Sequence, residues 1–151
     1  MTLHLLVDDR EKRPYRFKGH PVETEECRLQ TGDYAVAGDG RLDGQTFKPG
    51  FAVERKTKDD FLSSITHGRE RFERELARAS KWSHPIPVCI EAPEATLRGG
   101  DYRRDIHPNA VKGTIDSWRT SKPAIFNFFE SRVVAEEFTF RLLRWHNRYH
   151  L

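Results

Sequence analysis

Residues 51–60 read FAVERKTKDD, and they follow the shorter motif GDY, residues 32–34, after a glycine-punctuated insert. Three apolar residues before an acid and two bases are typical of a buried strand that ends in a polar site. Because side chains alternate across a strand, we expect Glu54 and Lys56 on one face and Arg55 on the other. The stretch therefore predicts an acid and a lysine side by side at the end of a strand.

Asp33, in the GDY motif, can join this pair from a neighbouring strand. Two carboxylates can hold a hard divalent cation, and a lysine can stabilise the charge that develops during attack on a phosphate. We therefore predict Mg²⁺ or Mn²⁺ at Asp33 and Glu54, with Lys56 beside the ion. Taken one residue at a time, an exposed ladder of ion pairs at a strand end would explain the same charges.

The same residues resemble the signature of a known family, the XPF-type structure-specific DNA endonucleases that carry the ERCC4 domain. That signature is G-D, a variable insert and then E-R-K-x-x-x-D, and the matching positions are Gly32, Asp33, Glu54, Arg55, Lys56 and Asp60. Residues 7–11, VDDRE, resemble the family's opening V-D-x-R-E, and residues 68–72, GRERF, resemble the start of its next helix. The resemblance extends from about Leu5 to Trp145.

This resemblance implies a fold and a set of site residues. The fold would be the three-layer restriction-endonuclease-like α/β fold, with a central mixed sheet flanked by helices, in a single nuclease domain over residues 1–151. The implied catalytic residues, next to the metal ligands Asp33 and Glu54, are Asp8, Arg10, Glu11, Arg55, Lys56 and Asp60.

Two of these residues have a further interpretation. Thr57 and Asp60 match a capping box, so the Asp60 carboxylate could simply cap its own helix. Arg55 lies on the strand face opposite to Lys56, and we expect it to pair with an acid such as Asp60.

Four arginines are candidates for contacts with DNA. Arg71 matches a family arginine near the cleft, whereas Arg98, Arg103 and Arg104 lie in residues 93–105, which we expect to form a mobile basic loop. A solvated helix face and a solvated loop are the alternatives.

The alternation of strands with helices independently predicts an α/β sandwich around a mixed sheet. Hydrophobic periodicity and turn residues predict strands at residues 3–7, 22–29, 34–37, 51–56, 86–91 and 124–129, and helices from Thr57, over 69–82, over 108–119 and from Ser131. The polar insert before residue 51 contains hairpin or loop turns, and it is either a plain excursion or a surface that touches DNA.

The terminal helix is rich in large apolar residues. Val134, Phe138, Leu142, Trp145 and Tyr149 are predicted to share one of its faces. This face would pack inside the monomer or form the interface of a homodimer.

Composition sets outer limits on the function. The formal net charge of +3, with 32% charged residues and a pI near 9.0, is compatible with a polyanionic partner without requiring one. The two cysteines, Cys27 and Cys89, lie in predicted strands, which favours buried free thiols. With no signal peptide and no apolar run that could span a bilayer, we expect an intracellular protein, cytoplasmic, nucleoid-associated or nuclear, without a membrane partner.

The resemblance to the XPF-type family, together with the charged motif, implies a metal-dependent endonuclease that cuts branched or flapped DNA in repair, recombination or replication. The alternatives are a non-catalytic DNA-binding scaffold that assists an active nuclease, and a nuclease that nicks duplex DNA with a different preference. Intact Asp33, Glu54 and Lys56 argue against the scaffold. Many relatives carry helix-hairpin-helix modules after the nuclease domain or a helicase domain before it, and residues 1–151 contain neither pattern. We therefore expect that the nuclease domain dimerises and binds DNA alone, that a targeting protein assists it, or that the chain is a fragment.

Overall fold

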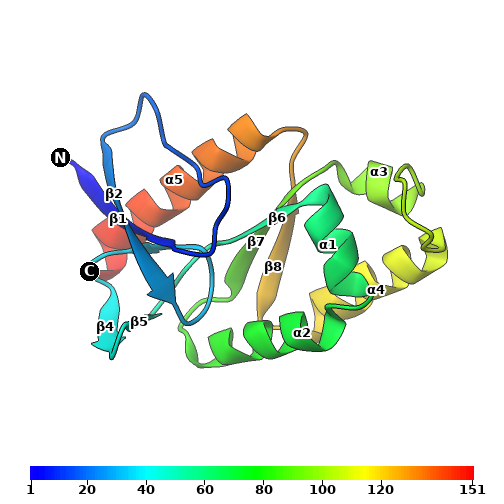
Figure 1. The fold of residues 1–151 in the computed structure, drawn as a ribbon, viewed down its shortest axis with the longest axis horizontal. Helices are drawn as coiled ribbons and strands as arrows, with labels where there is room; N and C mark the ends of the chain where they lie inside the picture. The colour runs from blue at the N-terminus through cyan, green and yellow to red at the C-terminus, as the bar shows by residue number, and fades with distance from the viewer.

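The computed structural model describes every residue from Met1 to Leu151 (Figure 1). Its strands are β1 (Leu3–Asp8), β2 (Val22–Leu29), β3 (Tyr34–Val36), β4 (Gly40–Asp43), β5 (Thr46–Pro49), β6 (Glu54–Thr57), β7 (Ile86–Glu91) and β8 (Ala124–Phe128). Its helices are α1 (Lys58–Ile65), α2 (Arg69–Arg78), α3 (Glu94–Arg98), α4 (Pro108–Ser121) and α5 (Arg132–His150), and the 3-10 turn η1 (Ala79–Lys81) follows α2.

The strands form a mixed sheet in two parts. The first part has the order β3-β1-β2-β5-β4, in which β1, β2 and β5 run parallel and the outer strands β3 and β4 run antiparallel to their neighbours. The second part, β6-β7-β8, is parallel throughout. An antiparallel bridge between Tyr34 and Val53 joins the two parts. The bridge brings the residue before β3, Asp33, next to the start of β6.

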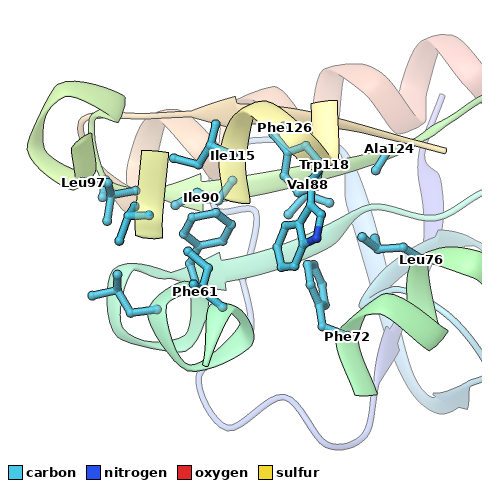
Figure 2. Close-up of a cluster of buried hydrophobic side chains, with 14 of the residues drawn as sticks. Phe61, Phe72, Leu76, Val88, Ile90, Leu97, Ile115, Trp118, Ala124 and Phe126 are labelled. Atoms are coloured by element: carbon cyan, nitrogen blue, oxygen red, sulfur yellow. The ribbon is translucent and has the colours of Figure 1, made fainter. Parts of the chain in front are cut away.

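Helices cover both faces of β6-β7-β8, and the side chains of successive β7 residues point to opposite faces. Val88 and Ile90 belong to the core beneath α1, α2 and α4, which is built around Trp118 (Figure 2). Cys89 belongs to the core beneath α5, together with Leu143. This alternation is the period of two expected for a strand with both faces buried. The predicted arrangement of a mixed sheet between helical layers is confirmed.

The caps that the sequence predicted account for the helix boundaries. α1 begins after Thr57, whose Oγ1 accepts a hydrogen bond from the Asp60 amide at 3.1 Å. α2 begins after Gly68, as predicted. α5 begins after Ser131, whose Oγ accepts from the Val134 amide at 3.3 Å. Side-chain oxygens satisfy amide groups that the first turn of a helix leaves without partners.

The structure corrects the predicted position of the motif strand. The apolar residues Phe51, Ala52 and Val53 are buried but precede β6, and the polar residues Glu54–Thr57 themselves form the strand. They do so because β6 pairs in parallel with the buried strand β7, with Glu54 opposite Val88. The charged side chains therefore emerge from the strand itself, as predicted, but the strand begins at Glu54 and not at Phe51.

The predicted mobile loop over residues 93–105 is also wrong in part. Residues 94–98 form helix α3, and Leu97 on this helix is fully buried. The arginines of this segment are therefore placed by a helix that is anchored in the core.

The predicted apolar stripe of α5 is not its buried face. The buried residues of this helix are Ala135, Thr139, Phe140 and Leu143. Phe138 and Leu142 are half-buried against the same core, whereas Val134, Trp145 and Tyr149 are exposed. Both sides of the helix carry apolar residues, so periodicity alone did not identify the side that packs.

Cys27 and Cys89 are free thiols, and Cys89 is buried as predicted while Cys27 is only partly so. None of the helices combines the length and the apolar composition that crossing a lipid bilayer requires.

Glu94 ties α3 to α4 through ion pairs. Its carboxylate accepts two hydrogen bonds from Arg119, each 2.7 Å, and one from Arg98 at 2.8 Å. The bonds from Arg119 and then Arg98 lower the pKa of Glu94 to about 2, from 4.5. A depressed pKa in the folded state adds stability above the unfolded pKa, and this stability is lost as the pH falls through the folded value.

Glu94→Gln is therefore expected to lower the free energy of unfolding by about 1 kcal/mol near neutral pH, since the pair is partly exposed to solvent. The difference from the wild type should shrink as the pH falls from about 4.5 to about 2. Thermal unfolding across this range measures it, with the exposed Glu130→Gln as the control. A difference that does not change with pH would exclude this role.

Candidate functional site

Backbone hydrogen bonds converge on Asp33 from three parts of the chain. The Asp33 carbonyl accepts from the Asp8 amide at 2.8 Å, and the Asp33 amide donates to the Val53 carbonyl at 2.8 Å. The Asp33 Oδ2 accepts from the Arg55 amide at 2.7 Å. The end of β1, the start of β3 and the strand β6 therefore meet at this one residue.

Gly32 is required by the backbone at this point. It has a φ of +83°, and a Cβ there would lie 2.5 Å from the Cβ of Ala52. Glycine alone adopts this conformation at low cost and leaves that space free. The glycine of the GDY motif thus allows Asp33 to approach β6.

Glu54 and Lys56 lie side by side on one face of β6, as predicted. The Lys56 Nζ is 3.4 Å from the Glu54 Oε2 and lies 4.5 Å from the centre of the Phe72 ring. Glu54 is 4% exposed, and its Oε1 has no hydrogen-bond partner. A buried carboxylate oxygen without a partner is costly, and it marks a place where a ligand could bind.

A third carboxylate, Glu75 of α2, completes the group. Its Oε2 accepts a hydrogen bond of 3.3 Å from the Gly32 amide. Its charge also raises the pKa values of Asp33, Glu54 and Lys56, so it lies close to all three. Helix α2 thereby contributes to a site that the motif strands begin.

The pKa values in this group reflect a crowd of carboxylates. Burial, and then the charges of Glu11 and Glu75, raise the pKa of Asp33. Burial, and then the charges of Asp33 and Glu75, raise the pKa of Glu54. Burial acts to lower the pKa of Lys56, but the carboxylates around it outweigh that effect and raise the pKa. The site therefore favours a charged lysine and disfavours additional negative charge.

Arg55 points to the other face of β6, into a separate network. It donates to both carboxylate oxygens of Glu91, at 2.8 and 3.2 Å, and to Glu11 at 3.3 Å. Its guanidinium lies 5.1 Å from the centre of the Tyr15 ring, and the Tyr15 hydroxyl donates to Glu91. The Arg55 side chain is 8% exposed, so this pair is largely shielded from water.

The predicted pairing of Arg55 with Asp60 is therefore wrong. Asp60 is exposed on α1, whereas Arg55 faces Glu91, which ends the neighbouring strand β7. Thr57 caps α1, but the Asp60 carboxylate accepts no hydrogen bond from the Thr57 amide, so only half of the capping box forms. A catalytic role for Asp60 stays a prediction.

Asp8 and Arg10 pair with each other at the end of β1. Arg10 donates to the two Asp8 oxygens at 2.9 and 3.0 Å and to the Leu29 carbonyl at 2.7 Å. The hydrogen bond to Asp8 is the main cause that raises the pKa of Arg10. Asp8 also accepts from the Leu29 amide at 3.0 Å. These contacts hold β1 against β2, and the charge of Asp8 is balanced locally.

The four candidate DNA-binding arginines differ in their surroundings. Arg71 and Arg103 are exposed and make no ion pair within the chain. Arg98 pairs with Glu94 and Asp116, and Arg104 with Asp59 at 2.8 Å. Arg98 and Arg104 therefore hold α3 and the segment after it in place, a role that the sequence did not predict.

The carboxylates of the site outnumber the cations that lie near them. Arg10 balances Asp8, and Arg55 is shared by Glu91 and Glu11. Lys56 is therefore the cation that contacts Glu54, while Arg10, already paired with Asp8, also acts on Asp33 and Glu75 from a greater distance. No group of three or more His, Cys, Asp or Glu side chains is spaced to enclose a metal ion by itself. The site thus offers an excess of hard oxygen donors, but the protein alone would not fill the coordination shell of an ion.

Glu75, Glu91 and Tyr15 were not predicted as members of the site. Glu91 could have been found, because it ends a buried strand that neighbours β6, and such strands deliver polar side chains to one edge. Glu75 gave no such signal, because it is one of several alternating charges on an amphipathic helix. Tyr15 lies in a connection whose path no local pattern defines.

The mixed sheet and its flanking helices are similar to the fold of solved XPF structures. The model of the ERCC4 domain matches residues 7–131, and the chain belongs to the ERCC4 domain family. The match confirms the resemblance inferred from the motif residues.

Two solved structures are similar to this chain. XPF from Aeropyrum pernix has a TM-score of 0.64 at 20% identity, over 93% of this chain and 65% of that chain. XPF from Aeropyrum pernix in complex with DNA has a TM-score of 0.65 at 19% identity, over 97% of this chain and 66% of that chain. This chain therefore spans just under two thirds of the length of those structures. Among curated proteins, none matches this chain.

Proposed function

We propose that this chain is a divalent-metal-dependent endonuclease that hydrolyses phosphodiester bonds in branched or flapped DNA, in repair, recombination or replication. The observation that carries this proposal is the surplus of carboxylates around one lysine, with a buried oxygen of Glu54 left without a partner. Hydrogen bonds within the protein give no reason to gather several carboxylates in one place, whereas a divalent cation compensates their negative charge.

Mg²⁺ or Mn²⁺ fits the donors of this site. Asp33 and Glu54 would hold the ion, since both are carboxylates and one oxygen of Glu54 is free. Hard oxygen donors suit these ions, and Mg²⁺ usually binds one or two carboxylates and keeps several waters. Bound in this way, the ion would acidify a water and offset negative charge on a phosphate.

Other residues of the chain position Asp33 and supply a positive charge to the site. The backbone amide of Arg55 holds Asp33, and the ion pair of Arg55 with Glu91 fixes the strand that carries this amide. Lys56 stays charged between Glu54 and the Phe72 ring, so it is available to stabilise charge on the phosphate or to orient a water. Neither task requires Lys56 to change its protonation state. We further propose catalytic roles for Asp8, Arg10, Glu11 and Asp60, as the family resemblance implies.

DNA as the substrate is supported by the family and by the likeness to an XPF structure that contains DNA. Arg71 and Arg103, which are exposed and unpaired, are available to contact phosphates. We also propose that the chain forms a homodimer through α5, since Val133, Trp145 and Tyr149 leave apolar surface uncovered there. A targeting protein that delivers the nuclease to its DNA is the remaining proposed partner.

A panel of labelled DNA forms tests the substrate directly: linear duplex, single strand, 3′ flap, splayed arm and four-way junction. We expect cutting near a branch with Mg²⁺ or Mn²⁺ and none with EDTA. Asp33→Ala and Lys56→Ala should each remove cutting while leaving folding and DNA binding largely intact. Cutting confined to unbranched duplex would favour the nicking nuclease, and binding without cutting under every metal would favour the scaffold.

A further inference from the structure

A basic groove lies between the C-terminal end of α2 and the β4–β5 hairpin. Figure 1 shows this hairpin at one end of the molecule. Two adjoining depressions, of about 470 and 480 Å³, share Gln30, Arg78 and Lys81 in their linings. The charged residues that line them are five cations and one carboxylate: Arg41, Lys48, Arg74, Arg78, Lys81 and Asp39. A chain with a net charge of only +3 thus concentrates its positive charge here.

The cations come from both walls of the groove. On one wall, Arg74, Arg78 and Lys81 recur at spacings of four and three residues, so they follow one side of α2 and η1. On the other wall, Arg41 of β4 and Lys48 of β5 are opposite each other in the ladder. A positive groove with cations on facing walls suits the sugar-phosphate backbone of a nucleic acid strand.

Most of these cations make no ion pair or side-chain hydrogen bond that would stabilise the fold. Arg41, Arg74 and Lys81 are exposed and make no ion pair or side-chain hydrogen bond within the chain. Lys48 pairs with Asp43 at 2.9 Å, and the only acid of the lining, Asp39, is held by a hydrogen bond of 2.7 Å with the His146 ring. Three cations are therefore free to meet an anionic partner.

The groove leads to the proposed active site. Arg78 donates to the Thr31 Oγ1 at 3.0 Å, and Thr31 is followed by Gly32 and Asp33. One turn earlier on the same helix, Glu75 accepts from the Gly32 amide. The turn that carries Asp33 is thus fastened to the wall of the groove at two points.

The hairpin wall is fixed by the fold. The Gln30 amide donates to the Phe47 carbonyl at 2.9 Å, and the Gly50 amide to the Asp39 carbonyl at 3.0 Å. A Cβ on Gly40 would lie 2.2 Å from the Lys48 carbonyl oxygen, so only glycine lets the two strands meet at this point. The polar insert is therefore an ordered wall of the groove.

We propose that this groove binds the backbone of the DNA strand that flanks the scissile phosphate, through Arg41, Arg74, Arg78 and Lys81. The inference rests on the proposed function for the position of the cut, but the groove's affinity for DNA is independent of catalysis. It adds to Arg71 a second set of contacts, on the side of Asp33 that faces the hairpin.

The test compares two variants of the full chain that each lose three positive charges. The first carries Arg41→Gln, Arg74→Gln and Lys81→Gln. The control carries Arg16→Gln, Lys18→Gln and Lys112→Gln, which are exposed residues without intrachain ion pairs outside the groove. Binding to labelled single-stranded and flapped DNA is measured in EDTA at several salt concentrations, so that no cleavage is needed.

We expect the groove variant to bind at least about tenfold more weakly at low salt, with a salt dependence reduced by about 0.7 to 0.9 per lost phosphate contact. The control variant should bind almost as the wild type does. Equal losses in both variants, or no loss in the groove variant, would overturn the proposal. If the wild type binds through the groove but never cuts, the groove stands and the proposed nuclease activity fails.

Discussion

Glu54→Gln is expected to lower the rate of metal-dependent DNA cleavage by at least about 100-fold and to make the metal-free protein more stable. The loss of cleavage follows because Glu54 supplies a proposed metal ligand with an unpartnered oxygen. The gain in stability, about 1–3 kcal/mol, follows because an ionised carboxylate buried beside Asp33 and Glu75 is unfavourable without a metal. The two effects have opposite signs, which distinguishes a ligand from a residue that only supports the fold.

The stability effect should depend on pH in a defined direction. The folded pKa of Glu54 is raised, so the ionised side chain costs stability as the pH rises above its unfolded value of 4.5. The advantage of Glu54→Gln in EDTA should therefore be small at pH values below about 4.5 and grow toward neutral pH. Urea unfolding measures it, with the exposed Glu70→Gln as a control. A variant that is destabilised in EDTA, or that cuts DNA as the wild type does, would contradict the assignment.

Arg55→Ala is expected to destabilise the protein by about 3–5 kcal/mol, because it leaves two largely buried carboxylates without their partner. Glu91 and Glu11 are 10% and 15% exposed, and both depend on the Arg55 guanidinium. Arg55→Lys should recover part of the loss, since it keeps the charge but not the paired hydrogen bonds to Glu91.

The measurement is urea unfolding, and the matched control is Arg71→Ala on the exposed side of α2, which should change stability by less than about 0.5 kcal/mol. If Arg55→Ala costs no more than the control, the network around Glu91 does not stabilise the fold. If Arg55→Ala stays folded, its cleavage rate also reports how far Asp33 depends on the Arg55 amide.

The core of the candidate site could be predicted because it follows from strand geometry. Alternation along a strand is enough to place Glu54 beside Lys56, and the glycine before Asp33 indicated a turn into the same edge. The α/β sandwich around a mixed sheet followed from the alternation of strands and helices. These features depend on local periodicity, which a single sequence records.

What could not be predicted depends on how distant elements pack. Glu75 enters the site because α2 buries its own residues Phe72 and Leu76 in the core. The orientation of the helix is therefore set by the whole core. Arg55 pairs with Glu91 and not with Asp60 because β7 lies beside β6, a contact between residues far apart in the chain. Periodicity left open whether the apolar stripe of α5 packs inside the monomer, because apolar residues lie on both sides of that helix.

The most direct test is cleavage of a 3′-flap DNA by the wild-type chain and by Asp33→Asn, side by side, in Mg²⁺, Mn²⁺ and EDTA. The proposed function predicts cutting by the wild type with either metal, none in EDTA, and at least about a 100-fold slower rate for Asp33→Asn with unchanged DNA binding. Cutting that persists in EDTA, or that Asp33→Asn performs as fast as the wild type, would contradict a metal-dependent nuclease at this site.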